Sequence, residues 1–174
     1  MAYGKSDYSN ATVKGKIAIT INYTDENLKP VSAVRIVLDE APIVLNSTTV
    51  QAGSIKISLS GIETCSGRID TRDYSGTCEE VAMEAFNDVI RYAHVWICNA
   101  FVSEKGKNHQ FATCYTRTFL EGGIDFRGMI EDDLVGLGSH RVVIGKDGKP
   151  QRPDLLKAQE TAVFNHFQMW NIKK

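Results

Sequence analysis

Cys78 is the side chain whose position is best suited to covalent chemistry. Thr77 and Glu80 stand three residues apart, which is the spacing of a capping box at the start of a helix. Cys78 is then the first helical residue, where free backbone N–H groups and the helix dipole stabilise a thiolate. The same position suits one end of a disulfide. The segment therefore predicts a nucleophile or a bridge and leaves the choice open.

His140 offers the base that such a nucleophile would need. It stands directly before a short apolar run, residues 141–144, which we expect to form a strand. A cysteine at a helix start with an imidazole on a neighbouring strand predicts a cysteine-dependent hydrolase. The competing interpretation, which we favour, makes Cys78 a bridged or half-buried cysteine and His140 a solvated residue.

The four cysteines of the chain are Cys65, Cys78, Cys98 and Cys114. No two of them have the two-residue gap of a zinc knuckle or a redox motif, so we expect no metal site. Four cysteines allow three disulfide connectivities, or they stay reduced. Because Cys65 and Cys78 bracket a polar loop with little core of its own, we expect a bridge between these two.

That loop, residues 66–77, is the candidate binding segment. Charges of both signs alternate along it and a tyrosine stands near its end. Functional contacts concentrate on loops that rigid elements hold in place. The candidate binding residues are Arg68, Asp70, Arg72, Asp73 and Tyr74.

Three triplets match the acceptor pattern for N-linked glycans. They begin at Asn10, Asn22 and Asn46. The pattern has meaning only in a eukaryotic secretory protein, and the sequence does not identify that setting.

Composition excludes several classes of protein. The 174 residues are 43% hydrophobic and 24% charged, with a net charge of −1, which is ordinary for one globular domain. Because acidic and basic residues balance, the chain as a whole has no excess of positive charge for binding nucleic acid. No apolar run approaches the roughly 18 residues that a membrane span needs. The polar start of the chain has no apolar signal core. We therefore expect a protein that is cytoplasmic or viral, or one exported after loss of a signal.

The front of the chain predicts an antiparallel meander. Hydrophobic and polar residues alternate at 16–24, at 34–38 and at 55–59. Pro42 interrupts the second of these runs, so we place residues 34–45 at an edge of the sheet.

The later elements alternate between helix and strand. Residues 78–96 have the spacing of an amphipathic helix, residues 111–119 are typical of a strand, and residues 129–135 of a short helix. A last helix should begin at Pro153. The sequence thus predicts a polar tail at 1–15 and a single α+β domain at 16–174. Its antiparallel sheet of about five or six strands should pack against the central and C-terminal helices.

No motif supplies a cofactor site, and we expect none. The favoured function is a non-enzymatic protein-binding or assembly module that acts through its sheet edges and the 66–77 loop. A viral or phage component, an inhibitor and an exported surface protein all fit this description. Its partner would be another protein or a second copy. The alternative is the hydrolase built on Cys78 and His140.

Overall fold

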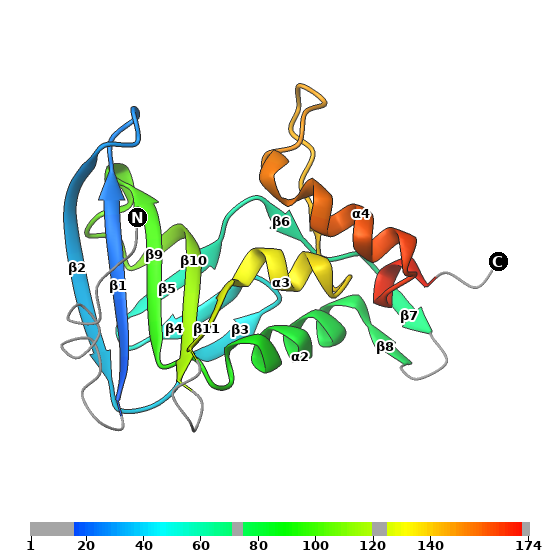
Figure 1. The fold of residues 1–174 in the computed structure, drawn as a ribbon, viewed down its shortest axis with the longest axis horizontal. Coiled ribbons are helices and arrows are strands. Elements are labelled where there is room, and N and C mark those ends of the chain that lie inside the picture. Colours follow the sequence, from blue (N-terminus) through cyan, green and yellow to red (C-terminus); the bar gives the residue numbers. More distant parts are fainter. Residues whose placement is uncertain (1–15, 71–74, 120–124, 172–174) are drawn as a thin grey trace.

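The computed structural model describes residues 16–70, 75–119 and 125–171, and a β-sheet is its largest element (Figure 1). The tail predicted at 1–15 lies outside the described residues. In the described part of the chain the sheet has eight strands in the order β2-β1-β9-β10-β5-β4-β3, with β11 paired to β10. The strands are β1 (Ile17–Thr24), β2 (Pro30–Leu38), β3 (Ile43–Asn46), β4 (Thr49–Ala52), β5 (Ile55–Leu59), β9 (Val95–Phe101), β10 (His109–Phe119) and β11 (Asp125–Met129).

The α+β prediction is confirmed, whereas the prediction of a wholly antiparallel sheet of fewer strands is wrong. β1 runs parallel to β9, and β5 runs parallel to β10. The other pairs are antiparallel. Alternating hydrophobicity predicts that a segment is a strand, but it carries no information about which strand lies beside it.

Helix α2 (Cys78–Ile90) begins where the capping box predicts and ends earlier than the predicted residue 96. The chain turns after Ile90 and re-enters the sheet as β9, with the Trp96 side chain fully buried. Ala93 and Ile97 fit the spacing of a helix as well as that of a strand. The β-branched and aromatic residues of β9 favour the strand, and packing in the sheet decides the outcome.

The described residues also form two small sheets and three short 3₁₀ turns. β6 (Ile62–Glu63) pairs with β12 (Arg141–Val142), and β7 (Arg68–Asp70) pairs with β8 (Ser75–Thr77). The 3₁₀ turns are η1 (Val102–Glu104), η2 (Pro153–Leu155) and η3 (Gln168–Trp170). The strand predicted at 141–144 is thus shorter than expected.

Helix α3 (Ile130–Gly136) forms close to the predicted bounds, and the C-terminal helix α4 (Leu156–Phe164) packs against it. The last helix starts at Pro153 only as the turn η2. α2 and α3 lie beside the sheet, and α4 lies on the far side of α3 (Figure 1). The prediction that the C-terminal helix packs on the sheet is therefore corrected.

The core lies where β1, β4, β5, β9 and β10 meet α2 and α3. Ile21, Phe86, Trp96 and Leu134 are among its fully buried side chains. Removing one such side chain from water is worth about 1.5–3 kcal/mol. This burial holds the sheet and the two helices together.

The predicted sheet edge around Pro42 is confirmed in the described residues. β2 and β3 are the two ends of the strand order, and residues 39–42 connect them. A Cβ placed on Gly53, in the β4–β5 turn, would lie 3.1 Å from Cδ2 of Leu38 at the end of β2. The two ends of the sheet therefore approach each other near this connection.

A buried ion pair fastens the C-terminal part of the chain to the sheet. Nη1 of Arg152 lies 3.4 Å from Oε1 of Glu131, a carboxylate with no exposed surface. The same Nη1 donates to the Ser60 carbonyl and to the Thr113 hydroxyl, and Arg152 also pairs with Asp154. This one guanidinium therefore connects α3, β10 and the end of β5.

Gly61 provides a test of this arrangement. Its φ is +73°, and a Cβ there would stand 2.5 Å from Cγ of Arg152. We expect Gly61→Ala to cost more than the 1–2 kcal/mol of left-handed strain alone, because Arg152 must also shift. Gly148→Ala is the matched control, since Gly148 has φ +77° and open space at the Cβ position. Equal losses of unfolding free energy in urea titrations of the two variants would contradict the role given to Arg152.

Candidate functional site

Strand β2 presents an unpaired side along its full length. Eight of its nine residues pair with β1, with a register shift that skips Val31, and no described strand pairs with its other side. Val31, Val34 and Val37 are 55%, 40% and 44% exposed. Exposed edge strands with apolar side chains are templates for pairing with another chain. β2 is therefore a candidate interaction surface.

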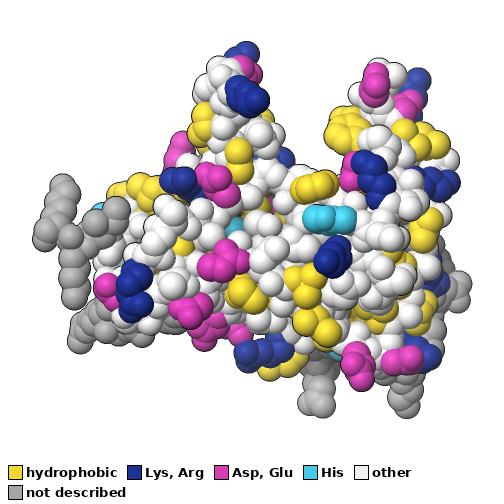
Figure 2. All heavy atoms as spheres, turned by 180° about the vertical axis from the view of Figure 1, so that it is seen from behind, with side chains coloured by type: hydrophobic (Ala, Val, Ile, Leu, Met, Phe, Trp, Pro, Cys, Tyr) yellow, Lys and Arg dark blue, Asp and Glu magenta, His cyan; other side chains and the backbone are white. Residues whose placement is uncertain are grey.

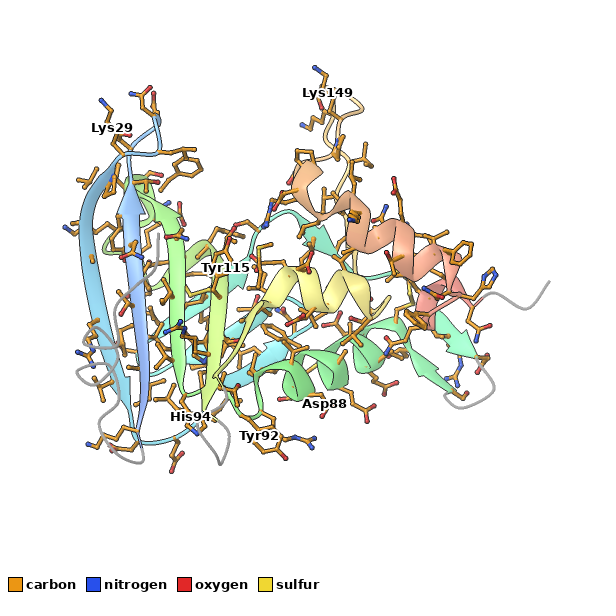
Figure 3. The ribbon with its side chains drawn as sticks, viewed as in Figure 1. Lys29, Asp88, Tyr92, His94, Tyr115 and Lys149 are labelled. Carbon is orange, nitrogen blue, oxygen red and sulfur yellow. A yellow bond between two sulfur atoms is a disulfide. The ribbon has the colours of Figure 1, made fainter. Side chains whose placement is uncertain are left out.

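A cleft of about 320 Å³ lies between two projecting turns, and Figure 2 shows it as a notch between them. Lys29 marks the tip of the β1–β2 turn and Lys149 that of the other turn (Figure 3). Leu28, Phe101 and Phe111 line the cleft and are 71%, 54% and 54% exposed. Exposed apolar side chains gathered at one concave place are typical of binding surfaces.

Polar groups form the rest of the cleft. Asn99 and Thr113 line it, and Arg152 lies at its wall. The guanidinium already donates to Ser60, Thr113 and Asp154. The cleft can therefore hold an apolar group flanked by hydrogen-bonding groups, while Arg152 keeps its structural partners.

A chain of hydrogen bonds next to the cleft was not predicted from the sequence. Oγ of Ser58 lies 2.6 Å from Oγ1 of Thr49 and 2.7 Å from Nε2 of His109. The His109 ring stacks on Phe111, with the ring centroids 5.2 Å apart. A hydroxyl beside an imidazole is one part of a nucleophile–base arrangement. However, Ser58 is only 4% exposed and its hydroxyl is also hydrogen-bonded to Thr49, so it joins β4, β5 and β10.

The sequence held only a weak signal for this chain of hydrogen bonds. Ser58 falls on the polar side of the predicted strand at 55–59, and His109 falls in a polar stretch. Only the parallel pairing of β5 with β10 brings them together, and that pairing could not be derived from the alternation.

The predicted binding loop is a small hairpin formed by β7 and β8. Ser75 ties it together, since Oγ accepts from Nη2 of Arg68 at 3.1 Å and donates to Asp70. Arg68 and Asp70 remain exposed. The other predicted binding residues, Arg72, Asp73 and Tyr74, lie outside the described residues. Ile69 anchors the hairpin in a small cluster with Cys78 and Val81.

The predicted bridge is present. Sγ of Cys65 and Sγ of Cys78 are 2.04 Å apart, and Cys78 is 2% exposed. The capping box is present as well, with Glu80 N–H donating to Oγ1 of Thr77 and Thr77 N–H donating to Oε2 of Glu80. The helix start therefore carries a disulfide in place of a thiolate. A second buried disulfide joins Cys98 of β9 to Cys114 of β10, a pairing that the sequence left open.

His140 is buried rather than solvated. Nε2 donates to the Ser47 carbonyl at 2.8 Å, and Nδ1 lies 2.9 Å from the Ser139 hydroxyl. Burial lowers the pKa of His140 to about 4, against the opposing effects of the Ser47 hydrogen bond and the Glu79 charge. The ring stays neutral and its two nitrogens are engaged. With Cys78 bridged, the structure does not form the Cys78–His140 pair that the hydrolase alternative requires.

A wider groove of about 620 Å³ lies between α2 and α3. Asp88 and Tyr92, labelled in Figure 3, line it together with Asp132 and Asp133. Burial, and the neighbouring Asp132 charge, raise the pKa of Asp133. Asp88 pairs with Arg91. The groove is acidic, with Asp88 and Asp132 exposed and Asp133 half-buried, and none of the residues that line it identifies a ligand.

Among residues 16–70, 75–119 and 125–171, no group of three or more histidine, cysteine and acidic side chains has a geometry that could hold a metal ion. No helix of this part of the chain is long and apolar enough to cross a membrane.

No protein-family model and no curated protein matches the sequence. A proposal for the function therefore depends on the geometry of the surfaces described above.

The neutral, buried His140 predicts a defined dependence of stability on pH. A histidine with a lowered pKa binds its proton more readily in the unfolded chain, so stability should be lost as the pH falls from about 6.5 to about 4. The loss from this residue should be at most about 3 kcal/mol. His140→Gln should be less stable at neutral pH and should lose less stability over this interval. Urea titrations at several pH values measure the difference, and parallel pH curves for the two proteins would rule the explanation out.

Proposed function

We propose that the protein is a non-enzymatic protein-binding and assembly module, and that β2 pairs with β2 of a second copy. The observation that carries the proposal is the open, apolar side of this edge strand. Every second residue of β2 directs its backbone groups away from β1, and Val31, Val34 and Val37 add exposed apolar area on the two faces of the strand.

Side-chain complementarity supports pairing of β2 with itself. An antiparallel pair with its two-fold axis at Val34 places Val31 opposite Val37 of the second copy and Ala33 opposite Arg35. Such an interface uses the same patch on both copies and closes at a dimer. Moving the axis to Arg35 would set two like charges opposite each other, which is unfavourable in a sheet. The sequence of β2 thus supports one register over its neighbour.

The other edge of the sheet is a poorer template. β3 has four residues, with a register shift in the middle of its pairing with β4, whereas β2 has nine residues and its register shift lies at one end, at Val31. Short and irregular edges resist pairing with another chain. This contrast supports β2 as the edge that associates. The β7–β8 hairpin, with Arg68 and Asp70 exposed, is proposed as a separate contact surface for a different partner.

A lysine substitution tests the proposal. Val37→Lys places a charge on the exposed side of β2, where a second strand would desolvate it, so the dissociation constant of the dimer should rise at least tenfold. Val163→Lys is the matched control, because Val163 is 42% exposed on α4 and far from the sheet edge. Analytical ultracentrifugation over a range of protein concentrations measures both.

The control should associate as the unchanged protein does. A protein that stays monomeric at high micromolar concentration would refute the proposal. The same conclusion would follow if Val37→Lys and Val163→Lys gave equal dissociation constants.

A further inference from the structure

The three glycosylation triplets of the sequence fall in different surroundings. Asn10 lies outside the described residues. Asn22 lies within β1, which has β2 on one side and β9 on the other. Its Nδ2 donates to Oδ1 of Asn99 at 3.4 Å, and the middle residue of the triplet, Tyr23, is 1% exposed. Asn22 is therefore a half-buried residue in the middle of the sheet, and its acceptor nitrogen is engaged by Asn99.

Asn46 is presented differently. It is exposed at the end of β3, where the chain turns into β4. Its Oδ1 accepts from the Thr48 backbone N–H at 3.0 Å, and Oγ1 of Thr48 lies 3.4 Å from the same oxygen. This Asx turn engages the oxygen with the backbone and side chain of Thr48. In the described part of the chain Nδ2 has no hydrogen-bond partner, so it faces solvent.

The middle residue of this triplet fixes the turn. The Ser47 N–H donates to Oε1 of Glu79 at 2.7 Å, and the Ser47 carbonyl accepts from Nε2 of His140 at 2.8 Å. Ser47 is 7% exposed. Helix α2 and the buried histidine thus hold the turn from inside, and the two flanking side chains of the triplet stay at the surface.

We infer that Asn46 is the site of an N-linked glycan. Nδ2 would attack C1 of a lipid-linked oligosaccharide diphosphate, forming the C1–N bond while the C1–O bond to the diphosphate breaks. The diphosphate leaves with the bonding electron pair, and the proton lost by the amide nitrogen passes to the released diphosphate. Hydrogen bonds from Thr48 to Oδ1 stabilise negative charge on that oxygen and so favour loss of the proton.

The disulfides support the setting that this chemistry needs. All four cysteines are paired, two of them by the buried Cys98–Cys114 bridge. Disulfides of this kind form in oxidising compartments such as the lumen of the endoplasmic reticulum. A glycan at Asn46 would stand at the end of β3 and would shield this edge, while β2 stays open.

The test uses the full chain directed into the secretory pathway of cultured human cells. The secreted protein, checked for both disulfides, is treated with peptide N-glycosidase F in water enriched in oxygen-18 and digested for mass spectrometry. This treatment converts each glycosylated asparagine to a labelled aspartate. We expect the label at Asn46 and none at Asn22.

Variants of the triplet provide the controls. Asn46→Gln and Thr48→Ala should each remove the label and the matching mass of glycan, whereas Thr48→Ser keeps the hydroxyl and should retain both. Asn22→Gln should leave the glycan mass unchanged. Secreted protein that carries no label at Asn46, or that carries as much label at Asn22, would overturn the inference.

Discussion

The burial of one carboxylate constrains the whole structure. Glu131 has no exposed surface, and burial raises the pKa of its side chain to about 7 although Arg152 and two backbone N–H groups oppose the shift. A buried charge without a partner costs several kcal/mol. Arg152 is the partner, and it reaches Glu131 only when the segment after β12 lies across the sheet at Ser60 and Thr113. The docking of the C-terminal part therefore depends on this pair.

The candidate surfaces follow from that docking. Arg152 lies at the wall of the cleft, between the turn that carries Lys149 and the strands that carry Phe101 and Phe111. Glu131 also accepts from the Cys114 N–H of β10, next to the disulfide that joins β10 to β9. The centre of the sheet is thus fixed by an ion pair and a covalent bond. Among the described strands β2 is paired only with β1, which leaves its other backbone edge open.

The sequence predicts local structure well and pairing poorly. The alternation of β1, the capping box before Cys78 and the Cys65–Cys78 bridge are all found in the structure, since each depends on residues close in the chain. The parallel neighbours of β1 and β5 depend on packing between distant segments. The burial of His140 and the contact of Ser58 with His109 follow from that packing. The sequence therefore predicted a solvated His140, which is wrong, and gave no prediction of the contact between Ser58 and His109.

Amide hydrogen exchange of β2 at different protein concentrations tests the central claim, that this strand is an association surface. In dilute solution only the β2 amides that donate to β1 should be protected. As the concentration rises, the alternate amides of Pro30–Leu38 should gain protection, while those of α4 should exchange at an unchanged rate, because only the edge strand acquires new backbone partners. Exchange rates in β2 that are the same at every concentration would contradict the account.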